Sequence, residues 1–443
     1  MSRVDRAAEQ PRRSLWLERP AAQALGSQLG RLRRQLIRHQ RTTFLLASGL
    51  STAGSFAGLT AKGWLLLEGA HNPLLLALHF ALLSLPTLVV SGPAGVLTDR
   101  FGSERVLIRA QWGLFAAAVL GAVAIPISRG VAQDGLLLLS TLGIGIASAY
   151  ELTARNKYVA LLVEQPQALG PYLASFSVIF NVGKLVGPPI GGLLLAATGP
   201  TLALSLDAAS YLLPIAALLW LMEPQRDQER RSAPGSSASL ATAWRDCGPA
   251  LRHVLRFTGL ACLVGFFHPG LAPLMADRLM GPSPLALGLF TSVIAAGSIS
   301  GGVVLQRNAT ALGRRPSWLL GVSCLITGLA QVGLAIRGST LVALPWPQAW
   351  GLAMAFLIGL GTAALLAGTN LIIQVHAPQV LRGRMAGLGQ IAFLGGGGLS
   401  GLAAAALSEW PPLGVWGCFG LLGSLGIVLG SRELLLRRHM RLS

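Results

Sequence analysis

Three ionisable side chains interrupt long apolar stretches of the sequence: Lys62, Lys184 and Asp207. An ionisable residue within a membrane span costs at least a few kcal/mol, so each is by default a functional residue with a specific partner. The chemistry open to these groups is ion pairing, proton exchange by the carboxyl group, and electrostatic binding of an anionic or zwitterionic molecule by an ammonium group.

Lys62 and Asp207 are predicted to lie at a similar depth in the membrane. Each is on the order of 10 Å from the outer face, given a rise of about 1.5 Å per helical residue. We therefore expect either a buried ion pair between them or an Asp207 carboxyl that exchanges protons. An alternative is that the Lys62 ammonium group reaches the outer headgroups.

Lys184 is predicted nearer to the middle of its span, where reaching the headgroups is harder. We expect it to face a central cavity, where it would suit an anionic or zwitterionic substrate. The alternative is a contact with a backbone carbonyl or with Asp207 at a packed helix interface. Glu68 and Glu151 fall at predicted helix ends, where charges are usually interfacial.

Other kinds of site lack the residues that they need. Cys247, Cys262, Cys324 and Cys418 are far apart and form no C-x-x-C pair, and no two histidines have the spacing of a helical zinc site. The glycines from Gly395 to Gly398 are not followed by the lysine of a phosphate loop, so close helix packing explains them better. We therefore expect no metal, no cofactor and no enzymatic activity.

Composition and hydropathy predict a membrane protein that consists of α-helices. Of the 443 residues, 52% are hydrophobic and only 12% are charged, which is too little polar surface for a soluble globule. A spanning helix needs roughly twenty mainly apolar residues. Twelve such runs lie near 42–68, 74–97, 105–127, 135–153, 172–197, 201–222, 256–277, 285–305, 317–336, 341–373, 384–408 and 412–431.

The basic residues orient these twelve spans. With the N-terminus inside, 30 of the 35 Lys and Arg residues fall in the tails and loops on the inner side. This matches the enrichment of Lys and Arg in short cytoplasmic loops, and predicts a plasma (inner) membrane protein with both termini cytoplasmic. The net charge of +18 is thereby explained without a nucleic-acid partner.

The sequence divides into two halves with polar flanks. We expect a basic tail at 1–41, a six-helix bundle at 42–222, a cytoplasmic linker at 223–255, a second six-helix bundle at 256–431 and a basic tail at 432–443. Two halves of six spans are typical of secondary transporters, whose substrate sites lie between the repeats near the middle of the membrane.

The loop after the second predicted span resembles the signature of the major facilitator superfamily, G-x-L-x-D-R-x-G-R-[RK]. The matching positions are Gly95, Leu97, Asp99, Arg100 and Gly102, with Arg105 supplying a basic charge slightly later than usual. The resemblance implies the twelve-helix fold of two halves, with Asp99 as a gating residue near the start of the eleventh helix. The alternative for Asp99 is a turn residue that caps a helix.

The fifth predicted span is similar to the G-x-x-x-G-P-x-x-G-G motif of the antiporter branch. It matches at Gly183, Gly187, Pro188, Gly191 and Gly192. Glycines four residues apart allow helices to approach closely, so these residues are expected to pack helices together rather than to contact substrate. The resemblance associates this motif with export.

Three further stretches resemble the enterobactin-exporter-like and macrolide-efflux-like branch: 150–155, 207–211 and 382–384. The chain departs from that branch in its first span. Members often carry an acidic residue after a glycine midway along this helix, but here Ser55 follows Gly54. A coupling role of that acid cannot be carried over to this chain.

We expect a secondary transporter that exports amphipathic small molecules, drug-like or siderophore-like, by alternating access, with coupling to protons. One alternative is an uncoupled facilitator or lipid flippase, favoured by the missing first-helix acid. Another is a non-transporting assembly factor or receptor with the same fold. The expected partners are a small-molecule substrate, the lipid bilayer and protons, and the chain is expected to be a monomer.

Overall fold

The computed structural model describes residues 39–70, 72–163, 166–221, 244–338, 347–378 and 382–436. These residues form helices joined by short connections. The first half contains α2 (Gln40–Ala70), α3 (Pro73–Ser84), α4 (Pro86–Phe101), α5 (Ser103–Ile127), α6 (Val131–Leu161), α7 (Pro166–Thr198), α8 (Pro200–Ser210), α9 (Leu212–Ala216) and the π-helix η1 (Ala217–Leu221). The second half contains α11 (Pro249–Gly265), α12 (His268–Met280), α13 (Pro284–Arg307), α14 (Ala309–Gly313), α15 (Pro316–Gly338), α16 (Pro347–His376), α17 (Arg382–Glu409) and α18 (Gly414–Leu436).

Twelve segments of the described chain are long and apolar enough to span a membrane, as the sequence predicted. Two predicted boundaries were wrong at the basic end. Helix α4 continues through Asp99 and Arg100 to Phe101, and α6 continues to Leu161, so residues assigned to loops lie in helical turns. Similarly, α11 begins at Pro249, inside the predicted linker. These terminal helical turns consist largely of polar residues. A search for apolar runs therefore leaves them out, although their backbone is helical.

Local sequence signals set several of the helix ends. Asn72 precedes α3, and its side-chain oxygen accepts a hydrogen bond from the backbone N–H of Leu74 at 2.8 Å, while Pro73 fits the first turn. Between α4 and α5 the chain turns at Gly102, which has φ = 86°. The signature glycine is therefore required by a left-handed backbone that other residues rarely adopt.

Three of the twelve spans are built from more than one helix. The second span breaks between α3 and α4 at Leu85, the sixth between α8 and α9 at Tyr211, and the seventh between α11 and α12 at Phe266 and Phe267. Discontinuous helices in transporters place backbone ends and polar side chains at membrane depth. The second and third of these breaks lie close to buried ionisable residues, as described below.

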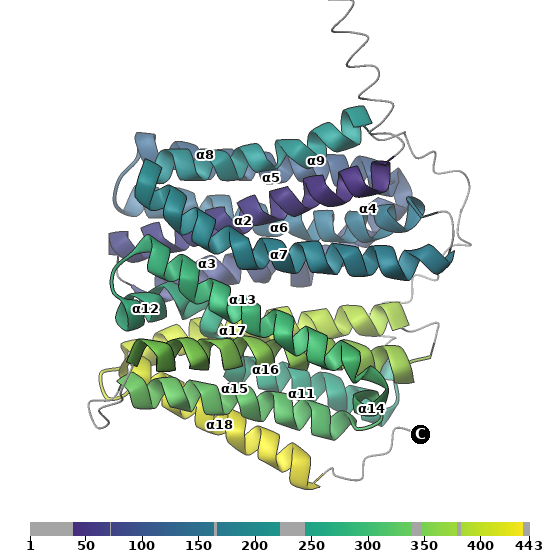
Figure 1. Cartoon of the computed structure of the whole chain (residues 1–443), viewed down its shortest axis with the longest axis vertical. Helices are drawn as coiled ribbons and strands as arrows, with labels where there is room; N and C mark the ends of the chain where they lie inside the picture. The colour runs from purple at the N-terminus through teal and green to yellow at the C-terminus, as the bar shows by residue number, and fades with distance from the viewer. Residues whose placement is uncertain are drawn as a thin grey trace, which may run out of the picture.

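The two halves lie one above the other in Figure 1, with the helices running roughly across the picture. They meet mainly along two pairs of spans: α7 packs on α13, and the α3–α4 span packs on α17. The second span of each half thus contacts the fifth span of the other. In addition, α12 packs on α3. The predicted packing role of the Gly395–Gly398 run is confirmed, since a Cβ at Gly398 would lie 2.8 Å from Ser84 Oγ in the opposite half.

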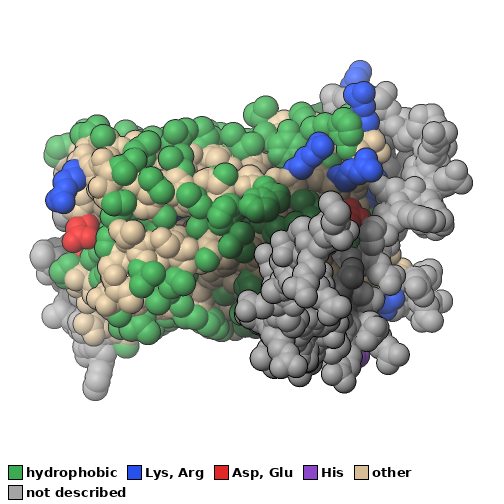
Figure 2. Space-filling view, turned by 90° about the horizontal axis from the view of Figure 1, so that it is seen from above, with side chains coloured by type: hydrophobic (Ala, Val, Ile, Leu, Met, Phe, Trp, Pro, Cys, Tyr) green, Lys and Arg blue, Asp and Glu red, His purple; other side chains and the backbone are tan. Residues whose placement is uncertain are grey.

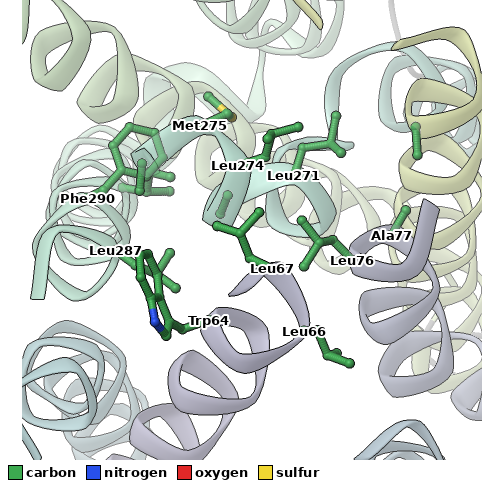
Figure 3. Close-up of a cluster of buried hydrophobic side chains, with 14 of the residues drawn as sticks. Trp64, Leu66, Leu67, Leu76, Ala77, Leu271, Leu274, Met275, Leu287 and Phe290 are labelled. Atoms are coloured by element: carbon green, nitrogen blue, oxygen red, sulfur yellow. The ribbon is translucent and has the colours of Figure 1, made fainter. Parts of the chain in front are cut away.

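The hydrophobic core joins the halves at only one end of the molecule. A large cluster includes Trp64, Leu67 and Leu76 of the first half together with Leu274 and Phe290 of the second half, as Figure 3 shows. This is the end opposite to the basic loops. At the basic end the described residues form separate cores, one containing Phe44 and Tyr158 in the first half and another in the second half. The packing is therefore asymmetric across the membrane.

The surface fits a membrane protein. In Figure 2 hydrophobic and uncharged atoms form a broad band, and charged side chains gather toward its two ends. Exposed apolar side chains such as Val89, Val96 and Trp220 belong to this band. The chain is thus a multi-pass membrane protein, and the side on which each end lies remains a prediction.

Membrane orientation can be tested by labelling single cysteines. The four native cysteines are buried, and burial raises the pKa of the Cys247 thiol, so little background labelling is expected. In right-side-out vesicles we expect a membrane-impermeant maleimide to label Arg129→Cys directly and Arg314→Cys only after permeabilisation. The reverse pattern would place the basic end outside.

Candidate functional site

The glycines of the antiporter-like motif line two packing faces of α7. A Cβ at Gly187 would lie 2.8 Å from Phe56 Cβ on α2, and a Cβ at Gly191 would lie 2.6 Å from Ala57 Cα. On another face, a Cβ at Gly192 would lie 2.8 Å from the carbonyl carbon of Pro284, next to α13. Gly183 faces α2 in the same way, and the Pro188 carbonyl lies against Gly288 of α13. The motif thus brings three helices together, which is the structural role expected for it.

Successive residues of an α-helix are rotated by about 100° around its axis, which places Lys184 between these two packing faces of α7. It therefore points toward the junction between the halves. Its ammonium group has no hydrogen-bond or ion-pair partner in the described part of the chain, so neither predicted alternative partner, a backbone carbonyl or Asp207, is observed. It does interact electrostatically with His268 of the second half. An unpaired ammonium group in this position suits an anionic ligand.

His268 begins α12 at the break in the seventh span. Its side chain is 3% exposed, and its Nδ1 atom has no hydrogen-bond partner. The preceding helix ends at Gly265, whose carbonyl accepts a hydrogen bond of 2.8 Å from the buried Gln331 amide. The centroid of the Phe266 ring lies 6.1 Å from that of Phe80 in the first half and 4.3 Å from that of Phe393 in the second half. Aromatic side chains from both halves therefore meet at Phe266. The break is therefore polar at its centre and aromatic around it.

Asp207 lies on α8 and is only 3% exposed. Its carboxyl group packs directly against Gly58 of α2, where any side chain would collide with it. Its Oδ1 atom has no hydrogen-bond partner. A buried carboxyl group with an unsatisfied oxygen is costly unless it is protonated or gains a partner.

Lys62 does not form the direct ion pair with Asp207 that we predicted. Its Nζ atom donates instead to Ser140 Oγ of α6 at 2.9 Å, although the two charges interact electrostatically. The alternative that Lys62 reaches the headgroups is also wrong, because the residue is completely buried. The prediction of an ion pair rested on the similar depth of the two residues in the membrane. Whether their side chains point toward each other also depends on the rotation of each helix about its axis, which the sequence does not give.

Several buried polar residues around this pair were not predicted. Tyr211 accepts a hydrogen bond of 2.8 Å from Ser55, the residue that stands where relatives often have an acid. On α3, His79 Nδ1 lies 2.9 Å from Thr141 Oγ1 and interacts electrostatically with Lys62. The sequence did contain a signal for His79. Like Lys62, it is a polar, titratable residue within a long apolar run.

Glu151 is buried rather than interfacial, contrary to our expectation. It forms an ion pair of 3.0 Å with Arg155 one turn further along α6. Arg155 lines a cavity of about 290 Å³ toward the basic end, between α2, α6 and α7. The lining also includes Ser48, Thr52, Asn156, Phe176 and Phe180. This cavity has the size and mixed polarity of a small-molecule site or of a water-filled entrance.

The signature motif lies at the basic end of α4. Asp99 forms an ion pair of 3.0 Å with Lys157 of α6, and both side chains are substantially exposed. Arg100 lies over the Phe101 ring at 5.3 Å, Leu97 is half-buried, and Arg105 is exposed. A Cβ at Gly95 would meet nothing within 4 Å. The ion pair joins two helices of the first half, and the gating role of Asp99 stays a prediction.

The fold and these buried charges define a class of protein: a membrane transporter with twelve spans in two six-helix halves. The family model described as transmembrane secretion effector matches residues 28–420, and the chain belongs to this family of the major facilitator superfamily. The predicted superfamily and fold are thereby confirmed.

Curated relatives and solved structures agree with this assignment. The chain is 26% identical over 378 residues to the multidrug efflux pump Tap of Mycobacterium tuberculosis, covering 82% of this chain and 86% of Tap. It is 25% identical over 251 residues to the enterobactin exporter EntS of Escherichia coli, covering 52% and 59% of the two chains. The fold is similar to that of a POT family transporter in complex with 5-aminolevulinic acid, with a TM-score of 0.71, 14% identity and coverage of 90% and 96%.

Proposed function

We propose that this transporter exports amphipathic small molecules in exchange for protons, with its basic end toward the cytoplasm. The observation that carries the proposal is Asp207, a buried carboxyl group with an unsatisfied oxygen inside the first half. The family and the names of two relatives, an efflux pump and an exporter, support the direction of transport.

The asymmetric core supports alternating access. A packed cluster closes the end opposite to the basic loops, whereas the halves have separate cores at the basic end. With the basic end in the cytoplasm, this arrangement corresponds to a state that is open inward. Export then requires the cluster around Trp64 and Phe290 to separate while the basic ends come together.

Asp207→Asn tests the coupling. In everted membrane vesicles energised by a proton gradient, we expect wild-type protein to accumulate a fluorescent amphipathic dye, sulforhodamine B or rhodamine 6G, and the variant to accumulate none. The amide cannot carry a proton in exchange for substrate. Asp246→Asn is the matched control, because this aspartate is exposed before α11 and should leave accumulation unchanged.

The same vesicles separate the competing functions. Flux that follows the dye gradient and ignores the proton gradient would indicate a facilitator or flippase, the alternative favoured by Ser55 in the first span. No flux of either dye would contradict the proposed export and favour a non-transporting role.

A further inference from the structure

A chain of buried polar side chains lies in the first half, linked partly by an ion pair and partly by electrostatic interaction alone. Glu151 is paired with Arg155 at the wall of the cavity, Tyr211 interacts electrostatically with Glu151 and Asp207, and Asp207 interacts electrostatically with Lys62. The surrounding helices are apolar, so each of these groups is costly to bury and needs a reason to be there. Export of a substrate between the halves does not by itself explain the chain.

On the basic side of Asp207 the chain consists of hydroxyl and carboxyl groups. Tyr211 follows Asp207 by one helical turn and interacts electrostatically with both Asp207 and Glu151. Its hydroxyl also contacts the Ser55 hydroxyl. Glu151 in turn is paired with Arg155 at the wall of the cavity. No hydrogen bond joins Asp207 to Tyr211 among the described residues, so a proton that leaves Asp207 toward the basic end needs water between these groups.

On the other side of Asp207, the chain of buried groups ends at a pocket that holds the Lys62 ammonium group. Ser140 accepts the hydrogen bond from Lys62 and donates its own proton to the Ala117 carbonyl at 2.6 Å. Gly121 leaves room for the lysine, since a Cβ there would lie 2.9 Å from Lys62 Cε. The lysine is therefore held by a specific pocket and not by an ion pair.

The two charges can stabilise each other, but in this structure they do not touch. A buried carboxylate needs a counter-charge, and a protonated carboxyl group does not. The long, flexible side chain of Lys62 can supply that charge by leaving Ser140 for Asp207. Its present position on Ser140 fits a state in which Asp207 carries a proton.

We propose that Lys62 is an internal cation that replaces the proton on Asp207 during each transport cycle, an inference that rests on the proposed proton coupling. The Asp207 O–H bond breaks, and water carries the proton past the Tyr211 hydroxyl to Glu151 or to the cavity. The Lys62 ammonium group then moves from Ser140 to the Asp207 carboxylate. Reprotonation of Asp207 returns Lys62 to Ser140.

The ion that competes with Lys62 is a proton and not a metal cation. Gly58 is in contact with the carboxyl group, which leaves no room for a coordinated ion on that side. The described residues contain no group of three or more His, Cys, Asp or Glu side chains that could hold a metal. Two titratable groups act on this pair: His79 of α3 interacts with Lys62, and Tyr211, on the same span as Asp207, interacts with Asp207. Glu151 of α6 interacts with Tyr211.

Purified protein in liposomes, with sulforhodamine B and rhodamine 6G as probes, separates this proposal from a structural role of Lys62. We expect Lys62→Met to lose accumulation driven by a pH gradient, because Asp207 cannot release its proton without a counter-charge. Exchange of labelled for unlabelled dye at equal pH should remain, because exchange needs no proton release. Arg129→Met, which removes an exposed cationic side chain between α5 and α6, should retain both activities.

Two further variants test the two ends of the chain. Ser140→Ala removes the site that holds Lys62 away from Asp207, so accumulation should require a more acidic lumen than in liposomes with wild-type protein. Tyr211→Phe should slow accumulation and leave dye exchange unchanged.

Each outcome bears on one proposal. If wild-type protein accumulates dye and Lys62→Met does so equally, the role of Lys62 is wrong while proton coupling stands. Loss of both accumulation and exchange in Lys62→Met, with Ser140→Ala unchanged, would make Lys62 a structural residue. Accumulation driven by a sodium gradient instead of a proton gradient would also overturn the proposal. If the wild type itself shows no coupled accumulation, the proposed function fails.

Discussion

Gly288→Val is expected to abolish transport and to lower the thermal stability of the purified protein. Gly288 lies on α13 where the two halves meet, and a Cβ there would lie 2.5 Å from the Pro188 carbonyl oxygen and 2.8 Å from Pro189 Cα. Both opposing atoms belong to the backbone or to a rigid ring, so neither can move aside as a flexible side chain would. Overpacking of this kind costs about 1–3 kcal/mol, and more where nothing yields.

The consequence for transport follows from the position of this contact. A penalty of about 1–3 kcal/mol corresponds to roughly 5-fold to 150-fold in the balance between two packed arrangements. Helices α7 and α13 hold the two halves together on one side. A valine side chain that pushes these helices apart should disfavour every state of the transport cycle in which they are in contact, and transport should be lost. Thermal unfolding in detergent and dye accumulation in vesicles measure the two effects.

A matched control lies on the same helix. A Cβ at Gly302 of α13 would meet nothing within 4 Å, so Gly302→Val should change stability and transport little. Equal losses of stability and transport in Gly288→Val and Gly302→Val would contradict the prediction. They would mean that glycines are needed for the flexibility of α13 and not for its contact with α7.

The sequence could predict the spans and much of the packing, because both depend on patterns along one helix. Twelve apolar runs and the repeat of Gly183, Gly187 and Gly191 need no knowledge of neighbouring helices. The same holds for Gly102, whose signature position coincides with a left-handed turn. These features are local, so their spacing is sufficient.

The partners of the buried charges could not be predicted, because they depend on helix rotation and on breaks. A change of helix rotation decides whether Lys62 faces Asp207 or Ser140. The breaks at Tyr211 and at Phe266 occur within apolar stretches that give no hydropathy signal. His268 therefore escaped notice, although it interacts electrostatically with Lys184 of the other half.

The two halves differ in the chemistry that they contain. The first half holds the buried Asp207, Lys62 and Glu151, whereas in the second half a hydrogen bond of 2.9 Å joins His253 to Glu433 near the basic end. Among the described residues, the region around the seventh-span break offers His268, Gln331 and aromatic rings. This division suggests that ion exchange belongs to the first half and that both halves contribute to substrate binding at their junction.

Lys184→Met is expected to remove a preference for anionic substrates. The Lys184 ammonium group has no hydrogen-bond or ion-pair partner among the described residues and interacts electrostatically with His268 of the other half. A hydrogen bond to a charged group contributes about 1.5–3 kcal/mol, which corresponds to roughly 10-fold to 150-fold in affinity. Sulforhodamine B and rhodamine 6G share a xanthene core but carry opposite net charges, so their affinities separate charge from size. Fluorescence polarisation with purified protein should show tighter binding of the anionic dye to the wild type.

The substitution should then weaken binding of sulforhodamine B by about tenfold or more and leave rhodamine 6G unchanged or bound more tightly. Lys184→Arg is the conservative control, because it keeps the positive charge in the same place and should keep the preference for the anion. A wild type without this preference, or a Lys184→Met variant that retains it, would show that Lys184 does not contact substrate. In that case the anionic group of a substrate would have to be recognised elsewhere, with Arg155 in the cavity of the first half as the next residue to test.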